Sequence, residues 1–120
     1  MAMIKYLETE DDVKIGRTVR IYITKNGSRA YELTDVVKEV EYDNSGNVIS
    51  FTTANGDFYV RKERIKAAFI DVSSAKVGER AFVIADGKQI LTSTVQWAFV
   101  SSYHSEVETS NTVYYQWKLP

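Results

Sequence analysis

The chain has 120 residues, a net charge of −1 from 15 basic and 16 acidic side chains, and no cysteine. Its length suits one ordinary domain or two very small ones, and an apolar fraction of 44% is typical of a folded globular protein. The lack of cysteine excludes disulfides, thiolate catalysis and cysteine-ligated zinc. The lack of a basic excess argues against a protein that binds duplex nucleic acid mainly through its phosphates.

The start of the sequence, Met1–Tyr6, has no basic segment followed by a long apolar run, so no signal peptide is expected. No apolar stretch approaches the roughly 20 residues that a membrane-spanning helix requires. We therefore expect a cytoplasmic protein.

Short segments rich in β-branched and aromatic residues alternate with turn sequences along the whole chain. Asn-Gly and Asp-Gly pairs favour type I′ hairpins, because both central residues of that turn need positive φ. The predicted strands, in chain order, are 4–8, 19–24, 47–53, 57–61, 66–72, 80–85, 95–100 and 113–117. The predicted turns are Asn26-Gly27, 43–46, Asn55-Gly56 and Asp86-Gly87.

The segment 33–40 has two interpretations. Leu33, Val36, Val37 and Val40 follow the spacing of an amphipathic helix. The adjacent pair Val36-Val37 also shifts a strand's alternation by one residue, as a β-bulge does. We prefer a long bent strand and keep a short helix as the alternative.

An internal repeat organises the sequence. Lys14-Ile15-Gly16-Arg17 resembles Lys76-Val77-Gly78-Glu79, and each is followed by an apolar strand and a turn. Further matches align Thr34-Asp35-Val36 with Ser93-Thr94-Val95, and 51–59 with 107–115. The repeat predicts two degenerate copies of one strand-and-turn unit.

The second copy ends just after its last hairpin, whereas the first continues into a strand at 66–72. The segment 4–8 has the length and apolar content to replace the missing strand, so we expect it to pair into the second unit. The predicted organisation is therefore an N-terminal strand and acidic connection over 1–13, one unit over 14–73 and a second over 74–120.

The first copy, with its Asn26-Gly27 turn, bent strand, hairpin and Tyr59–Ile65 run into a closing strand, resembles the SH3-like and Sm-like small barrels. The resemblance implies an all-β fold of two tandem SH3-like barrels packed together. In Sm-like proteins the stretch that corresponds to Tyr59–Ile65 often contributes to RNA binding. The second copy, through 92–95 and 107–114, resembles short proteins of Gram-positive bacteria and their phages, which implies a phage or mobile-element accessory protein.

No residue pattern indicates catalysis or a cofactor. His104 is the only histidine, and Ser101, Ser102 and Ser105 near it lack the spacing of a nucleophile elbow, so a polar hairpin loop is the expected structure. The acidic run Glu8–Asp12 lacks the glycine and the spaced ligands of a calcium loop. We expect no enzyme, no metal and no cofactor.

Two stretches are candidates for binding. The basic run Arg61, Lys62, Arg64 and Lys66, joined by Arg20 and Arg29, could bind nucleic acid, with Tyr22 or Tyr59 as a stacking face. The stretch 89–117 has no lysine or arginine and is dense in aromatic residues, as protein interfaces are at their centre. Alternation places Val95, Trp97 and Phe99 on one face, which we expect to fill the core, and leaves Tyr103 and one of Tyr114 or Tyr115 exposed.

The sequence thus predicts a binding protein. Its leading function is a protein–protein interaction module that binds or inhibits a host protein, or self-associates as a dimer, through Trp97, Tyr103, Tyr114 and Tyr115. The alternative is a nucleic-acid-binding small barrel.

Overall fold

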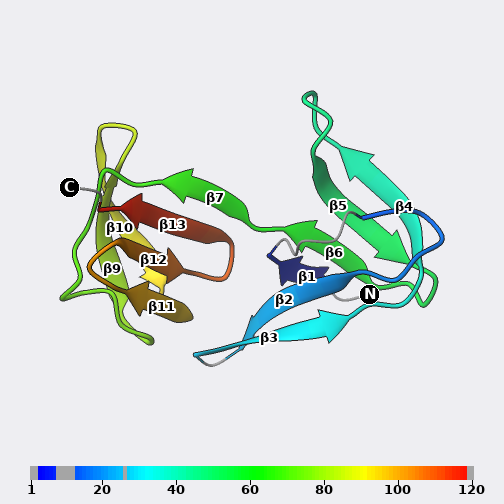
Figure 1. Cartoon of the computed structure of the whole chain (residues 1–120), viewed down its shortest axis with the longest axis horizontal. Coiled ribbons are helices and arrows are strands. Elements are labelled where there is room, and N and C mark those ends of the chain that lie inside the picture. Colours follow the sequence, from blue (N-terminus) through cyan, green and yellow to red (C-terminus); the bar gives the residue numbers. More distant parts are fainter. Residues whose placement is uncertain (1–2, 8–12, 26, 119–120) are drawn as a thin grey trace. The chain divides into compact units, whose positions relative to one another are not determined.

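The computed structural model describes residues 3–7, 13–25 and 27–118 (Figure 1). The β-branched and aromatic segments of the sequence form strands along the whole of this range. These residues form β-strands and no helix, so the all-β class is confirmed. The acidic run Glu8–Asp12 and the turn residue Asn26 lie outside the described residues. The strands are β1 (Met3–Tyr6), β2 (Arg20–Lys25), β3 (Ser28–Leu33), β4 (Val37–Tyr42), β5 (Val48–Thr53), β6 (Phe58–Arg61), β7 (Glu63–Lys66), β8 (Phe69–Ile70), β9 (Arg80–Ala85), β10 (Lys88–Thr94), β11 (Trp97–Val100), β12 (His104–Glu108) and β13 (Thr112–Trp117).

The chain divides into two compact units. Unit 1 comprises Met1–Ile23 and Arg29–Arg61, and unit 2 comprises Thr24–Ser28 and Lys62–Pro120. The main boundary between the units lies between Arg61 and Lys62. The sequence predicted this boundary between residues 73 and 74. The sheets have the strand orders β1-β6-β5-β4, β2-β3, β10-β9-β8 and β11-β12-β13-β7, and they are not closed into barrels.

Each unit follows the same strand order. A first strand precedes an antiparallel hairpin and a three-stranded meander, and the first strand pairs parallel with the last strand of its own unit (Figure 1). In unit 1 these elements are β1, β2–β3 and β4–β5–β6. In unit 2 they are β7, β9–β10 and β11–β12–β13, with β8 added beside β9.

The prediction that the N-terminal strand completes the second unit is wrong. β1 pairs with β6 in unit 1, where Ile4 lies opposite Tyr59. The corresponding place in unit 2 is already occupied by β7, where Ile65 lies opposite Tyr114. β7 lies mainly between the predicted strands 57–61 and 66–72, and the repeat begins at β1 and at β7. The shared pair Ile4-Lys5 and Ile65-Lys66 is its trace in the sequence.

Backbone hydrogen bonds confirm the first match of the repeat. The amide of Gly16 donates to Val37 O at 2.8 Å, and that of Gly78 donates to Val95 O at 2.9 Å. Both glycines have positive φ, at 87° and 89°, a conformation that glycine adopts without steric cost. The loops that contain them therefore bend the two units in the same way.

The other two matches shift by one residue. Val37 corresponds to Val95, through the shared bonds to Gly16 and Gly78, where the sequence aligned Val36 with Val95. In the last hairpins, Thr53 N–H donates to Asp57 O, whereas Thr109 N–H donates to Thr112 O, so the second turn is one residue shorter. Tyr59 thus corresponds to Tyr114 and not to Tyr115.

The helix interpretation of 33–40 is also wrong. The expected bent strand is two strands, β3 and β4, separated by 34–36 and placed in different sheets. The register of β4 against β5 shifts between Val37 and Glu39, just after the bulge that was expected at Val36-Val37.

Each unit has its own apolar core. Tyr6 packs edge-on against Phe51 in unit 1, with 5.3 Å between ring centroids, and Phe51 stacks on Tyr59 at 4.8 Å. The core of unit 1 consists of Tyr6, Val19, Ile21, Ile23, Val37, Phe51 and Tyr59. The core of unit 2 consists of Ala67, Ile70, Ala75, Ala81, Val83, Val95 and Val107.

Candidate functional site

The sheet β11-β12-β13-β7 of unit 2 has one face on the core and one face turned away from it. Ala98, Val107 and Tyr114 pack against the core of unit 2. Because successive side chains of a strand point to opposite faces, the residues between them lie on the other side. We call this side the outer face; the cross-strand register gives it Arg64, Lys66, Trp97, Phe99, His104, Glu106, Glu108, Val113, Tyr115 and Trp117. Of these residues, Glu106, Glu108 and Val113 are buried.

Four rings form a continuous row across three strands of the outer face. Trp97 and Phe99 of β11 are nearly parallel, with centroids 6.3 Å apart. Phe99 lies 5.9 Å from the His104 ring of β12, which stacks at 4.6 Å on Trp117 of β13. Phe99 is 46% exposed and Trp117 is 57% exposed. This aromatic row (Trp97, Phe99, His104 and Trp117) presents ring surface to solvent, a composition that is typical of interfaces.

Tyr103 lies in the turn between β11 and β12, next to the aromatic row, and is 67% exposed. The backbone of this turn is held by Ser101, whose hydroxyl oxygen accepts the amides of Tyr103 at 3.2 Å and His104 at 3.0 Å. The amide of Lys118 donates to Tyr103 O at 2.8 Å. The turn therefore fixes the backbone of Tyr103 while its ring is open to solvent.

Beside the aromatic row, Arg64 and Glu106 of the outer face form an ion pair. Arg64 donates to Glu106 at 3.4 Å, and its guanidinium lies 5.0 Å from the centroid of the Tyr115 ring. His104 Nε2 lies 3.5 Å from the same Glu106 carboxylate. This part of the face thus combines aromatic surface with compensated charge.

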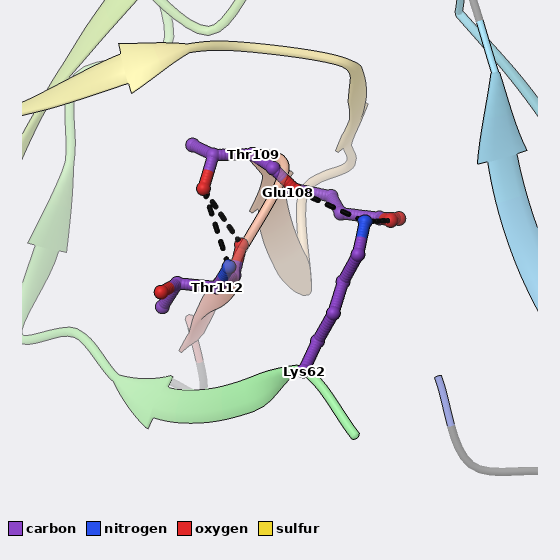
Figure 2. A network of polar contacts seen from close by, with 4 residues as sticks. All are labelled: Lys62, Glu108, Thr109 and Thr112. Atoms are coloured by element: carbon purple, nitrogen blue, oxygen red, sulfur yellow. Dashed lines mark hydrogen bonds and ion pairs between the residues drawn. The ribbon is translucent and has the colours of Figure 1, made fainter. Parts of the chain in front are cut away.

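Lys62 and Glu108 form an ion pair inside unit 2 (Figure 2). Lys62 is 4% exposed and Glu108 is fully buried, and Lys62 Nζ also donates to Thr109 O at 3.0 Å. Figure 2 shows the side chain of Lys62 reaching from the start of β7 toward Glu108. A buried charge of this kind requires its partner, because the low-dielectric interior does not solvate an isolated ion. Lys62 therefore neutralises a buried charge within unit 2.

The predicted nucleic-acid residues are divided between the two units. Arg20, Arg29 and Arg61 belong to unit 1, whereas Lys62, Arg64 and Lys66 belong to unit 2. Arg20 lies over the ring of Tyr31, 5.1 Å from its centroid. Lys62 is buried, whereas Arg64 and Lys66 share a face of β7.

Of the predicted protein-binding residues, Trp97 and Tyr115 lie on the outer face and Tyr103 lies beside it, whereas Tyr114 faces the core. Sequence reasoning missed Phe99, His104 and Trp117. Phe99 was expected in the core because Val95, Trp97 and Phe99 were assigned to one face. Val95 is buried, but β11 begins only at Trp97, and the bend between them brings Ala98 into the core instead. His104 was expected in a loop and is the first residue of β12.

Comparisons of the chain with known protein-family models, with curated proteins and with solved structures find no match. The described residues contain no helix that could cross a membrane. They also contain no cluster of three or more histidine, cysteine or acidic side chains placed to hold a metal ion.

The corresponding face of unit 1 has acidic residues at the positions that match Trp97 and Phe99. In the matched ladders, Glu39 opposite Thr52 corresponds to Trp97 opposite Glu108, and Glu41 opposite Ser50 corresponds to Phe99 opposite Glu106. Ser50 donates to Glu41 at 3.1 Å, and Glu39, Glu41, Ser50, Thr52 and Phe58 border a shallow depression there. The two units thus share a backbone plan and differ in surface chemistry.

Proposed function

We propose that the chain is a non-enzymatic protein-binding module that engages its partner through the outer face of unit 2. The aromatic row carries the proposal, because it spans three strands and leaves Phe99 and Trp117 open to solvent. Exposed aromatic side chains lose solvent-accessible surface at little entropic cost, and they dominate the binding energy of many protein interfaces. Tyr103, at the border of this face, is a further anchor.

The resemblance of the second copy to short proteins of Gram-positive bacteria and their phages suggests the biological setting. We propose an accessory protein of a phage or mobile element that binds or inhibits a host protein in the cytoplasm. We also propose that both units derive from one SH3-like small barrel by duplication. Their matched hydrogen bonds support a common origin.

The matched faces of the two units provide the variant and its control. Three proteins are compared: the unchanged full chain, the variant Trp97→Ala/Phe99→Ala and the control Glu39→Ala/Glu41→Ala. The variant and the control change matching ladder positions in unit 2 and in unit 1. Each protein is first checked for cooperative thermal unfolding, then immobilised in extract of a Gram-positive bacterium. A protein retained by the wild type and the control is purified and titrated against all three.

We expect the purified partner to bind the wild type and the control with similar affinity. The unit 2 variant should bind it about tenfold more weakly or worse, since interface aromatic residues often carry this much of the affinity. Equal affinity for all three proteins would contradict the outer face as the binding site.

A second function, binding of single-stranded nucleic acid, is favoured by one specific observation. Arg64 lies over the Tyr115 ring on the same face as the aromatic row, with Lys66 on the same face of β7. Rings that stack on bases beside cations that contact phosphates are the usual elements of such sites. The test is fluorescence anisotropy with labelled DNA and RNA at about 50 to 200 mM salt. Binding that falls with salt and is lost in Arg64→Glu/Lys66→Glu would support this function, and no binding at the lowest salt would contradict it.

A further inference from the structure

β11 is an edge strand without charge. It forms one border of the sheet β11-β12-β13-β7 and has the sequence Trp97-Ala98-Phe99-Val100. Phe99 is 46% exposed and Val100 is 47% exposed. Exposed edge strands usually carry charged residues or are very short, because a bare edge pairs readily with another strand.

The other edges of the described sheets follow that rule. Each is either the two-residue strand β8 or includes a charged residue. These charged residues are Lys5 in β1, Arg20 in β2, Arg29 in β3, Lys38 in β4, Arg64 in β7 and Lys88 in β10. The contrast with β4, which holds the same place in unit 1, shows that the charge-free edge is a feature of unit 2 and not of the repeat.

The backbone of β11 is oriented to accept another strand. The amide of Ser101 donates to His104 O at 2.9 Å, which makes these residues a hydrogen-bonded pair. Such pairs recur at every second residue of an antiparallel ladder, so Phe99 and Trp97 also direct their backbone groups toward β12. Ala98 and Val100 therefore direct their N–H and C=O groups away from β12, along the outer edge.

We propose that two copies of this chain pair antiparallel through β11. A two-fold axis at Phe99 places Ala98 opposite Val100 of the second copy and Val100 opposite its Ala98, which uses every outward backbone group of both strands. In this register no charged residue faces another. If β4 paired with β4 of a second copy in the same way, its charged residues would lie close to the charged residues of that copy. Like charges that face each other across a strand pair destabilise the pair.

The pairing joins the two outer faces, because directly opposed residues of an antiparallel pair lie on the same side of the sheet. The Phe99 rings of the two copies then meet at the centre, with Trp97 on either side. The aromatic rows become one surface that crosses both copies. This inference is argued from the charge-free edge strand β11. It holds whether or not the outer face binds another protein.

The first test is the mass of the full chain in solution over roughly a hundredfold range of concentration, up to several hundred micromolar. We expect the weight-average mass to rise from 13.7 kDa toward twice that value. Val100→Pro removes one outward N–H and should remain monomeric, whereas Val100→Thr keeps that N–H and should dimerise like the wild type. A wild type that remains monomeric throughout would overturn the proposal and leave the edge to a strand from another protein.

The second test does not require the proline variant to fold. Since the natural chain has no cysteine, Phe99→Cys carries a single thiol whose cross-linking is unambiguous. Opposed residues of a non-hydrogen-bonded antiparallel pair have Cα atoms about 4.5 Å apart, within the range of a disulfide. Mild oxidation should convert Phe99→Cys to a covalent dimer and leave Trp117→Cys, an exposed position two strands away, mainly monomeric. Equal cross-linking of both variants would refute the β11 pairing.

Discussion

Thr34 and Thr92 occupy the same position in the two units. The hydroxyl oxygen of Thr34 accepts the amide of Val19 at 2.9 Å, and that of Thr92 accepts the amide of Ala81 at 3.0 Å. Both threonines are buried. A side-chain oxygen thus satisfies a backbone donor at the start of each unit's hairpin.

Replacing either threonine with valine keeps the shape and removes the acceptor. Because a buried amide is then left without a hydrogen bond, we expect each of Thr34→Val and Thr92→Val to lower the free energy of unfolding by about 1–3 kcal/mol. Chemical denaturation measures this loss. Similar losses in both variants would follow from the shared position, and an unchanged stability in either would contradict its role.

Removing the hydroxyl group of Ser105 should have the opposite effect on stability. Its hydroxyl is buried on the core-facing side of β12 and has no hydrogen-bond partner among the described residues. Ser105→Ala removes this uncompensated polar group, so we expect the chain to become more stable by about 1 kcal/mol. The control is Ser101→Ala, which removes the acceptor of two backbone amides and should destabilise the chain. A loss of stability in Ser105→Ala would show that its hydroxyl is satisfied in solution.

The buried pair of Lys62 and Glu108 should behave as one group. Lys62→Met leaves the Glu108 carboxylate buried beside an apolar side chain, which typically costs about 3–5 kcal/mol. The double variant Lys62→Met/Glu108→Gln removes both charges and should recover part of that loss. Thermal unfolding of the two single variants and the double variant measures the coupling. Strictly additive losses would contradict a direct interaction.

High pH should destabilise the cores through two matched tyrosines. Burial raises the pKa of Tyr59, with the negative charges of Asp57, Glu32 and Asp35 adding to the shift, and burial likewise raises the pKa of Tyr114, with Glu63 adding. The folded state therefore favours the neutral phenol. Its contribution is fully present below the ordinary tyrosine pKa of 10.0 and is lost as the pH rises through the higher folded value.

The measurement is the free energy of unfolding as a function of pH above about 9. We expect it to fall as the pH rises, and to fall less steeply in Tyr59→Phe and Tyr114→Phe, which have no phenol to ionise. Tyr103→Phe, at an exposed position, is the control and should keep the wild-type slope. Identical slopes in all variants would contradict the assignment.

The sequence predicted the local features of the fold because those depend on neighbouring residues. Asp86-Gly87 is an example, with φ of 51° and 71° in a hairpin that pairs Ala85 with Lys88, as expected for a type I′ turn. The parallel partner of β1 could not be predicted in this way. Nothing near Ile4 indicates that Tyr59 lies opposite it, and the apolar content of the segment suits either unit.

The candidate site was predicted in part for a related reason. The alternation of residues predicted strands at 95–100 and 113–117, where β11 and β13 lie. The side that faces the core depends on the bend before Trp97 and on the shorter turn at Thr109–Thr112, neither of which the alternation of residues reveals. The charge-free edge of β11 is readable in the sequence, but its position as an edge becomes known only from the sheet order.

The parallel pairing of first and last strands also determines the order in which the two units can complete their sheets during translation. As the chain leaves the ribosome, β1 can pair only after β6 has been synthesised, and β7 can pair only after β13. Pairings between distant segments form slowly, because a long loop must close before the contact is made. Unit 1 can thus complete its sheet while unit 2 is still being translated. Unit 2 cannot complete its sheet until β13 has been synthesised.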